Sequence, residues 1–358
     1  MIAGGRLAAP VSNAGALGLI GGGYGDGGWL EREFSAAGNA RVGCGFITWS
    51  LAQRPELLGQ VLARQPAALM LSFGPVAAFA EQIRQSGVPV ICQVQSMAHA
   101  REAVGAGAEV IVAQGGEAGG HSGSRSTFTL VSEVANYLSK AAPDTVLVAA
   151  GGVADSRALA AALMLGADGV LIGSRLVAST EALTPSGFHD AIIAAEGDAT
   201  IKTSVIDLVR NYHWPDEFSG RALRNGFVDK WHGRENALTD PSSIASENQR
   251  YWAAFTAGDA DNAGVFMGEA VGAIHDVQPA ARIIEQMVAE AHGRLRHAGQ
   301  FVLSSAGGRA VGGGIAPSSC RSQPLIREGR PSATGRSLRR GLPGGGTETR
   351  VPSGRWRS

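Results

Sequence analysis

The chain has 358 residues, 44% of them hydrophobic and 17% charged, with a formal net charge of zero at pH 7. A balanced charge gives no overall attraction to nucleic acid or to anionic membranes, and no apolar run reaches the roughly 18 residues that suggest a membrane span. The cysteines, Cys44, Cys92 and Cys320, are far apart and odd in number, which argues against a disulfide scaffold or a metal site and favours a reducing, cytoplasmic location.

Seven short apolar runs, each followed by glycine or a small residue, are predicted as parallel strands buried on both faces. Helical stretches rich in Ala and Leu separate them, in the manner of βαβ units. The predicted strands are Leu17–Gly21, Arg41–Ile47, Ala68–Phe73, Pro89–Val94, Glu109–Ala113, Thr145–Ala149 and Gly169–Ile172. The helices between them include Pro55–Arg64, Val76–Ser86, Ala98–Ala106, Thr129–Lys140 and Asp155–Leu165.

The regularity of this series favours a TIM-type (β/α)8 barrel over an open doubly wound sheet, which is the alternative. A full barrel needs eight strands, so the first strand is expected to be missing or degenerate within Met1–Ala9. Residues 1–185 are assigned to this barrel core.

The pattern changes after the last predicted strand. Residues 186–304 are assigned to a smaller helical segment that packs on the barrel, with helices over Gly187–Glu196 and Gln278–Arg296. From residue 305 onward Gly, Ser, Pro and Arg dominate without apolar periodicity. Residues 305–358 are therefore predicted to be a disordered tail, because they cannot bury enough apolar surface to order themselves.

A glycine-rich loop after the fifth predicted strand carries the most informative chemical groups. Residues 112–123 read VAQGGEAGGHSG, which places Glu117 and His121 among glycines at the carboxyl end of a strand. That end is the catalytic face of a barrel. A neutral imidazole accepts a proton at physiological pH, so His121 is predicted as the catalytic acid/base residue. The alternative is a solvated histidine on a flexible loop.

Two later strands each end in a glycine turn that opens a helix. Gly151 and Gly152 precede one helix, and Gly173 and Ser174 repeat the arrangement one unit later. Backbone N–H groups in such turns favour a phosphate, and the last strands of a barrel are the usual phosphate site. These turns are predicted to hold a phosphate-bearing cofactor.

These segments resemble the nitronate monooxygenase (2-nitropropane dioxygenase) family over roughly residues 10 to 295. The specific likeness lies in GGEAGGHSG and in AAGGVADSRALAAALMLGADGVLIGSR, while SNAGALGLIGGG, VGCGFITWSL, VPVICQV and GEAVGAIHD add support. The resemblance implies an FMN-binding TIM barrel that oxidises alkyl nitronates, and in some members nitroalkanes, with O2 to a carbonyl compound and nitrite. The expected partners are therefore a small nitro compound and O2, and the oligomeric state stays open.

The resemblance also implies roles for individual residues. His121 matches the family's active-site histidine, which deprotonates a nitroalkane or stabilises the bound anion. Other residues match cofactor-contacting positions on the histidine loop and in the phosphate-binding turns, and one polar residue at a strand end is expected to meet the flavin ring. The expected FMN contacts are Gln93, Gln114, Gly119, Gly151, Gly152, Gly173 and Ser174.

Two alternative interpretations remain. Flavin-dependent enoyl-acyl-carrier-protein reductases resemble the family in fold, cofactor and histidine loop, and they need a reduced nicotinamide. The missing first strand also allows a truncated, inactive homologue with weak FMN retention, because a barrel without one strand exposes two edges. In addition, Pro10 stands where the helix after that first strand is expected.

Some conspicuous residues are assigned to packing. Cys44 and Cys92 lie within predicted strands and are expected to be small buried residues rather than nucleophiles. Trp214, Trp231 and Trp252 are expected to pack the helical segment against the barrel rather than to bind nucleic acid.

Overall fold

The computed structural model describes residues 2–238 and 240–303. The predicted tail over residues 305–358 lies outside the described residues, and so does Cys320. Residues 1–300 form one compact unit, which contains both the barrel and the segment that follows it. Within the described residues, no helix is long and apolar enough to cross a membrane.

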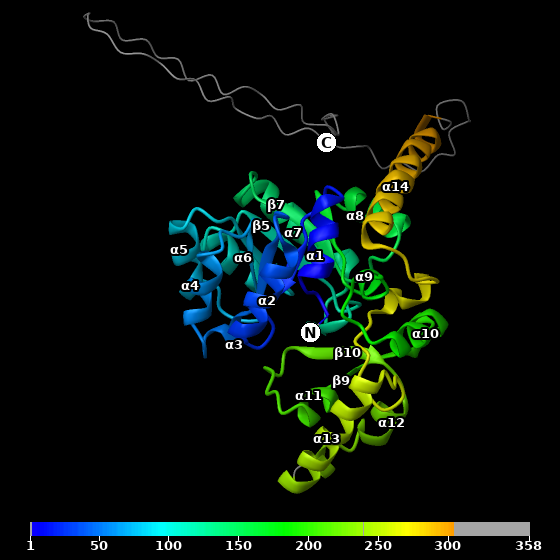
Figure 1. Ribbon diagram of the computed structural model, residues 1–358. Coiled ribbons are helices and arrows are strands. Elements are labelled where there is room, and N and C mark those ends of the chain that lie inside the picture. The colour runs from blue at the N-terminus through cyan, green and yellow to red at the C-terminus, as the bar shows by residue number, and fades with distance from the viewer. Residues whose placement is uncertain (1, 239, 304–358) are drawn as a thin grey trace, which may run out of the picture. The chain divides into compact units, whose positions relative to one another are not determined.

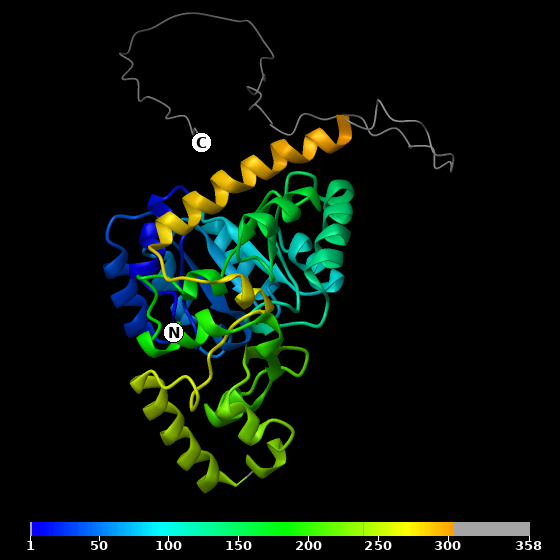
Figure 2. The ribbon, with the colours of Figure 1, turned by 90° about the vertical axis from the view of Figure 1, so that its right-hand side faces the viewer.

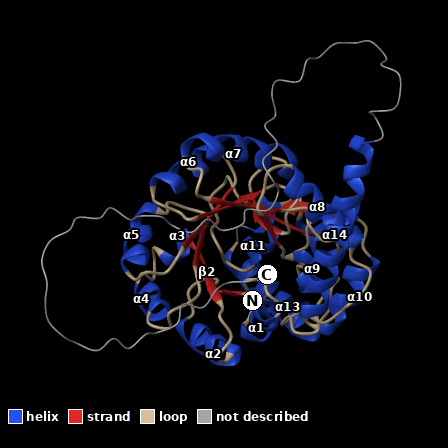
Figure 3. Ribbon diagram, turned by 90° about the horizontal axis from the view of Figure 1, so that it is seen from above, coloured by secondary structure: helices blue, strands red, loops and turns tan. Residues whose placement is uncertain are grey.

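Parallel strands in the order β1-β2-β3-β4-β5-β7-β8 form the central sheet. All seven predicted strands are confirmed, with slightly shifted ends. Figure 3 shows them as an arc inside a ring of helices, as in part of a TIM-type barrel. The strands are β1 (Leu19–Gly21), β2 (Gly43–Ile47), β3 (Leu69–Ser72), β4 (Val90–Val94), β5 (Val110–Gln114), β7 (Val146–Ala150) and β8 (Gly169–Leu171).

The helices of the barrel alternate with these strands, and the five predicted ones are confirmed. They are α1 (Gly5–Asn13), α2 (Gly27–Ala37), α3 (Thr48–Leu51), α4 (Glu56–Leu62), α5 (Ala77–Gln85), α6 (Met97–Gly105), α7 (Thr127–Ala141), α8 (Ser156–Met164) and α9 (Ser174–Val177). Helix α2 was not among the predicted helices, because only two of its residues, Leu30 and Ala37, are buried. Its start is nevertheless well defined, since the Asp26 carboxylate caps it by accepting a hydrogen bond from the N–H of Trp29.

The barrel core explains why the strands read as continuous apolar runs. Every residue of β4 is buried, because helices cover the outer face and other strands face the inner one. Cys44 and Cys92 belong to this core and are 0% exposed. Burial raises the pKa of each thiol to about 12, which confirms the prediction that both cysteines are packing residues.

The N-terminal residues take part in the barrel although they form no strand. The Ala3 carbonyl accepts a hydrogen bond from the Gly21 N–H, and the Ile2 carbonyl accepts one from Leu183. Residues 2 and 3 thus connect the end of β1 to the loop after α9. Helix α1 follows and includes Pro10, so the proline does not prevent a helix at this position.

Residues 186–303 fold around a second core and contain strands that sequence analysis did not predict. Here β9 (Thr200–Thr203) and β10 (Ser219–Leu223) join β6 (Gly120–Ser122), which comes from the barrel, in an antiparallel sheet of order β6-β10-β9. The helices are α10 (Ser186–Ala194), α11 (Val205–Val209), α12 (Gly226–Trp231), α13 (Pro241–Ala257) and α14 (Ala280–Leu303).

Helix α14 returns to the barrel after this second core. Its Ile283 and Met287 form a buried cluster with Val153, so the predicted helix packs on the barrel as expected. Figures 1 and 2 both show β9, β10 and α11 to α13 below the barrel and α14 along its upper side. Strand β6 comes from the barrel loop after β5 and pairs with β10, and it carries the predicted catalytic histidine.

Candidate active site

His121 lies in β6, which the glycine-rich loop forms after β5. This strand pairs with β10, and His121 is opposite Gly220. There is little room for a side chain at position 220. A Cβ on Gly220 would lie 2.9 Å from the Phe266 ring and 3.5 Å from His121 Nε2. His121 is 8% exposed. The imidazole is therefore buried and held by a sheet, unlike the solvated histidine of the alternative interpretation.

The imidazole of His121 is bonded to a carboxylate that sequence analysis missed. His121 Nε2 lies 2.7 Å from Asp207 Oδ2, and both side chains are buried. Asp207 belongs to α11 and stands in an otherwise apolar helix of sequence VIDLV. An acid in such a setting needs a partner, and this isolated charge was the available signal. The sequence could not identify the partner, because the two residues are 86 positions apart.

An aromatic cluster, defined as Tyr24, Trp49, Phe73, Trp214 and Phe218, lies beside the imidazole and contacts it through Trp214 and Phe73. The Trp214 ring stacks on His121 with centroids 3.4 Å apart and planes 4° from parallel. Tyr24, Trp49 and Phe73 follow β1, β2 and β3 and contact Trp214. Phe73 adopts φ +64°, a strained conformation for a bulky residue that clusters at functional sites. The cluster therefore lies at the carboxyl ends of the barrel strands, next to His121.

Only one of the three tryptophans has the predicted packing role. Trp214 joins the segment to the barrel through the aromatic cluster and through a 3.1 Å hydrogen bond from its Nε1 to the Tyr24 hydroxyl. Trp231 instead donates to Glu247, and Trp252 contacts Tyr251 and Phe255. The last two therefore stabilise the segment itself.

Buried glutamines hold the backbone of the histidine strand. Gln114 Nε2 donates to the His121 carbonyl at 3.1 Å, and Gln114 Oε1 accepts from Gln93 Nε2 at 3.1 Å and from Gln95 Nε2 at 3.0 Å. The structure thus brings the predicted residues Gln93, Gln114 and His121 together. Gln95 was not predicted. The glutamines fix the position of the histidine by bonding to one another and to its main chain.

Charged side chains hold the rest of the histidine loop. The Glu117 carboxylate accepts hydrogen bonds from the N–H and hydroxyl of Thr127 at the start of α7. On the opposite side Arg221 Nε donates to the Gly116 carbonyl, and Lys202 donates to the carbonyls of Ser122 and Gly123. Burial, followed by the nearby Arg221 charge, lowers the pKa of Lys202. Glu117 therefore has a structural role in the loop.

The two predicted phosphate turns are adjacent, because β7 pairs with β8. Gly151 and Gly152 adopt φ +91° and +74°, which disfavours any other residue there. Asp155 caps α8 by accepting from the N–H groups of Arg157 and Ala158. A phosphate would consequently use the N–H groups of the turns rather than the capped start of α8.

Gly119 and Ser174 also lie together. A Cβ at Gly119 would be 2.5 Å from the Gly268 nitrogen and 2.9 Å from Ser174 Oγ. Ser174 Oγ accepts a 2.9 Å hydrogen bond from the Gly268 N–H. These two predicted cofactor contacts therefore fix the histidine loop against the turn after β8. Gly173, beside them, is different, since a Cβ there would meet no atom within 4 Å.

These residues fit a polar ligand with a phosphate group. Open space remains above Gly173. Buried polar atoms at strand ends have no hydrogen-bond partner among residues 2–238 and 240–303, namely Thr48 Oγ1, Trp49 Nε1, Ser72 Oγ and Ser122 Oγ. Such atoms are costly unless something binds them. Over the same described ranges, no group of three His, Cys, Asp or Glu side chains could hold a metal ion.

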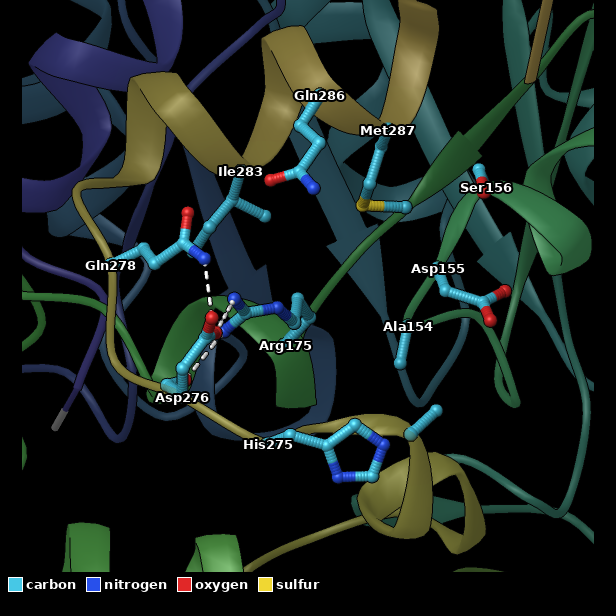
Figure 4. Close-up of a pocket in the computed structure, with 11 residues that line it drawn as sticks. Ala154, Asp155, Ser156, Arg175, His275, Asp276, Gln278, Ile283, Gln286 and Met287 are labelled. Carbon is cyan, nitrogen blue, oxygen red and sulfur yellow. Dashed lines mark hydrogen bonds and ion pairs between the residues drawn. The ribbon is translucent and has the colours of Figure 1, made fainter. Parts of the chain in front are cut away.

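A separate cavity of about 160 Å³ lies between α14 and the first residues of α8 and α9. Figure 4 shows Arg175 in its wall, turned toward Asp276. Arg175 donates to Asp276 Oδ1 at 2.6 Å and to the carbonyl of Ala178. Neither His121 nor Asp207 lines this cavity, so it is distinct from the histidine site.

Comparison with known proteins decides the family. Residues 53–290 match the family model described as nitronate monooxygenase. The chain belongs to the nitronate monooxygenase family. It is 32% identical to the nitronate monooxygenase of Neurospora crassa over 83% of this chain and 88% of that protein. It is also 32% identical to the nitronate monooxygenase npaC of Metarhizium robertsii, over 78% of this chain and 85% of that protein.

Solved structures confirm the TIM-type fold expected for this family member. FabK from Thermotoga maritima superposes with a TM-score of 0.73 at 27% identity, covering 84% of this chain and 92% of that one. A nitroalkane oxidase from Streptomyces ansochromogenes superposes with a TM-score of 0.69 at 23% identity, covering 83% and 94%. The open doubly wound alternative is therefore wrong.

Proposed function

We propose that this chain is an FMN-dependent nitronate monooxygenase. It oxidises alkyl nitronates, and nitroalkanes after deprotonation, with O2 to a carbonyl compound and nitrite. The observation that carries the proposal is the buried His121–Asp207 pair, 2.7 Å apart, in a member of the nitronate monooxygenase family. A base in a water-poor site at the catalytic face suits removal of a proton from carbon.

His121 accepts the proton from the carbon next to the nitro group. The resulting imidazolium then stabilises the nitronate anion through its positive charge. The stacked Trp214 ring and the rest of the aromatic cluster exclude water and give the alkyl part of the substrate an apolar surface. A nitronate that arrives already ionised needs only the stabilising role.

FMN, when bound, supplies the redox chemistry and the reaction with O2. Gly151, Gly152 and Gly173 would hold its phosphate through backbone N–H groups. Gly119 and Ser174 support that turn through their contacts with Gly268. Gln114 bonds the main chain of the histidine strand, and Gln93 bonds Gln114. Both side chains would border the flavin ring.

The test is the visible absorbance spectrum of the purified protein, followed by nitrite release when a nitronate is added in air. We expect flavin bands, nitrite formation, and loss of activity on neutral nitroalkanes in a His121→Ala variant. A folded protein that gains no flavin absorbance after addition of FMN would overturn the proposal and support the inactive homologue.

One second candidate is the alternative that the sequence resemblance left open, a flavin-dependent enoyl-acyl-carrier-protein reductase that uses a reduced nicotinamide. The two activities differ in the electron donor. Oxidation of NADPH or NADH by the FMN-loaded protein with an enoyl thioester, without any nitro compound, would support the reductase. Nitrite formation without a nicotinamide supports the monooxygenase.

A further inference from the structure

The contacts of the His121 ring indicate which of its nitrogens carries a proton. Nε2 lies 2.7 Å from Asp207 Oδ2, and a carboxylate at that distance accepts a hydrogen bond from an N–H group. The neutral ring therefore carries its proton on Nε2. The ring hydrogen bond found among the described residues is the one through Nε2, which leaves the Nδ1 lone pair to accept a proton from a substrate.

The side-chain hydrogen bond that Asp207 makes among the described residues goes to His121. Its Oδ1 has no hydrogen-bond partner in the described part of the chain. Its one ion pair within that part is the one with His121. Arg210 lies one turn later in the chain but contacts the rings of Tyr24 and Tyr212. A carboxylate buried for stability alone would be expected to bond through both oxygens.

The ring is also fixed in orientation. Trp214 stacks on one face of the ring, and Gly220 on β10 is the cross-strand neighbour of His121. Rotation of the ring by 180° about its Cβ–Cγ bond would remove Nε2 from Asp207 and leave a buried carboxylate without a partner. The orientation seen is therefore the one that the surroundings enforce.

We propose that Asp207 is a positioning residue that holds the Nε2–H tautomer of His121 and thereby makes Nδ1 the base for neutral nitroalkanes. The proposal rests on the proposed function. In the step, the C–H bond next to the nitro group breaks and its electron pair forms the C=N bond of the nitronate. The proton goes to Nδ1, and the imidazolium keeps its Nε2–H bonded to Asp207.

The experiment compares two substrates in FMN-loaded Asp207→Asn protein. Nitroethane must lose a proton, whereas ethylnitronate prepared beforehand is already ionised. An asparagine amide can donate to Nε2 and so favour the wrong tautomer. We expect kcat/KM to fall on the order of 100-fold for nitroethane, as for loss of a general base. For ethylnitronate we expect a loss of about threefold or less, within the range of a single hydrogen bond.

The matched control is Glu247→Gln, which removes another buried carboxylate charge from the same segment. Glu247 bonds Lys230 and Trp231 and has no contact with His121. We expect it to leave the ratio of the two kcat/KM values unchanged. If Asp207→Asn lowers kcat/KM equally for nitroethane and ethylnitronate, Asp207 acts only on stability. The same conclusion follows if Glu247→Gln also lowers kcat/KM for nitroethane much more than for ethylnitronate.

A second measurement does not depend on activity. Long-range 1H–15N correlation spectra of the histidine rings distinguish the two tautomers, and His121→Gln identifies the signal of His121. We expect the Nε2–H form in the wild-type protein. An Nδ1–H form would overturn the proposal even if nitronate oxidation is observed, whereas absence of nitrite formation with an Nε2–H ring would refute the proposed function and leave the tautomer assignment standing.

Discussion

Trp214 lies flat against His121, with ring centroids 3.4 Å apart and planes within 4° of parallel. The tryptophan comes from the segment after the barrel, but its Nε1 donates to the hydroxyl of Tyr24 after β1. The burial of Tyr24 raises the pKa of its hydroxyl to about 12, so it stays neutral as the acceptor. The candidate site is therefore closed by contacts between both parts of the unit.

We expect Trp214→Ala to lower kcat/KM for nitroethane by about 2- to 10-fold, since an aromatic pair contributes about 0.5–1.5 kcal/mol. Trp214→Phe keeps a ring over the imidazole and should retain most of the activity. Steady-state kinetics of both variants is the measurement. If kcat/KM falls as much in Trp214→Phe as in Trp214→Ala, the hydrogen bond to Tyr24 contributes more to activity than the stacked ring.

The open space above Gly173 gives a direct test of the phosphate site. Its φ of −108° suits any residue, and a Cβ meets no atom within 4 Å. We expect Gly173→Ala to leave the melting temperature of the FMN-free protein unchanged and to weaken FMN binding about 10-fold, or about 1.4 kcal/mol. Fluorescence titration with FMN measures the affinity.

The control for this variant is Gly169→Ala. Gly169 also has open space around it but lies at the amino end of β8. We expect its FMN affinity to match that of the wild-type protein. Unchanged affinity in Gly173→Ala as well would place the phosphate elsewhere.

Gly119 is required for close packing rather than for open space. A Cβ there would lie 2.5 Å from the Gly268 nitrogen and 2.7 Å from the Met267 carbonyl carbon, and main-chain atoms cannot move away cheaply. We expect Gly119→Ala to destabilise the fold by about 1–3 kcal/mol in urea unfolding. Gly105→Ala, in helix α6 with no atom near its Cβ, should instead stabilise by about 0.5–1 kcal/mol.

The ion pairs of Glu247 predict a pH dependence of stability. Burial raises the pKa of this carboxyl, but hydrogen bonds from Lys230 and Trp231 outweigh it, and the net effect lowers the pKa below 4.5. A lowered folded-state pKa means that the contribution to stability is complete above 4.5 and is lost as the pH falls through the folded-state value. We therefore expect the stability difference between wild type and Glu247→Gln to be constant above pH 4.5 and to shrink below it.

Urea unfolding of the two proteins on either side of that pH is the measurement. A stability difference between wild type and Glu247→Gln that grows as the pH falls would contradict the lowered pKa of Glu247.

The barrel could be predicted from the sequence because its signals are local. Each strand is a short apolar run, and each helix carries its own apolar face, as in α7 with Leu130, Val134 and Leu138 buried. The choice of His121 also rests on local signals, namely the glycines around it and the strand before it, and its catalytic role remains a prediction. Roles in binding FMN remain predictions.

The antiparallel sheet could not be predicted, because its signals are not local. Its strands read GHS, TIKT and SGRAL, without the alternation that marks a half-buried strand. They become strands because each supplies backbone partners to the next. Asp207 was missed for the same reason, since its role depends on His121, which lies far away in the sequence.

The antiparallel sheet also restricts how the site can open. Strand β6 carries His121, pairs with β10, and through it is joined to β9, which ends one residue before α11 with Asp207. A hinge motion of the segment away from the barrel would have to break these backbone hydrogen bonds and separate the base from its carboxylate. We therefore expect substrate to enter by rotation of side chains in the aromatic cluster. Entry of the substrate would then leave the bond between His121 and Asp207 intact.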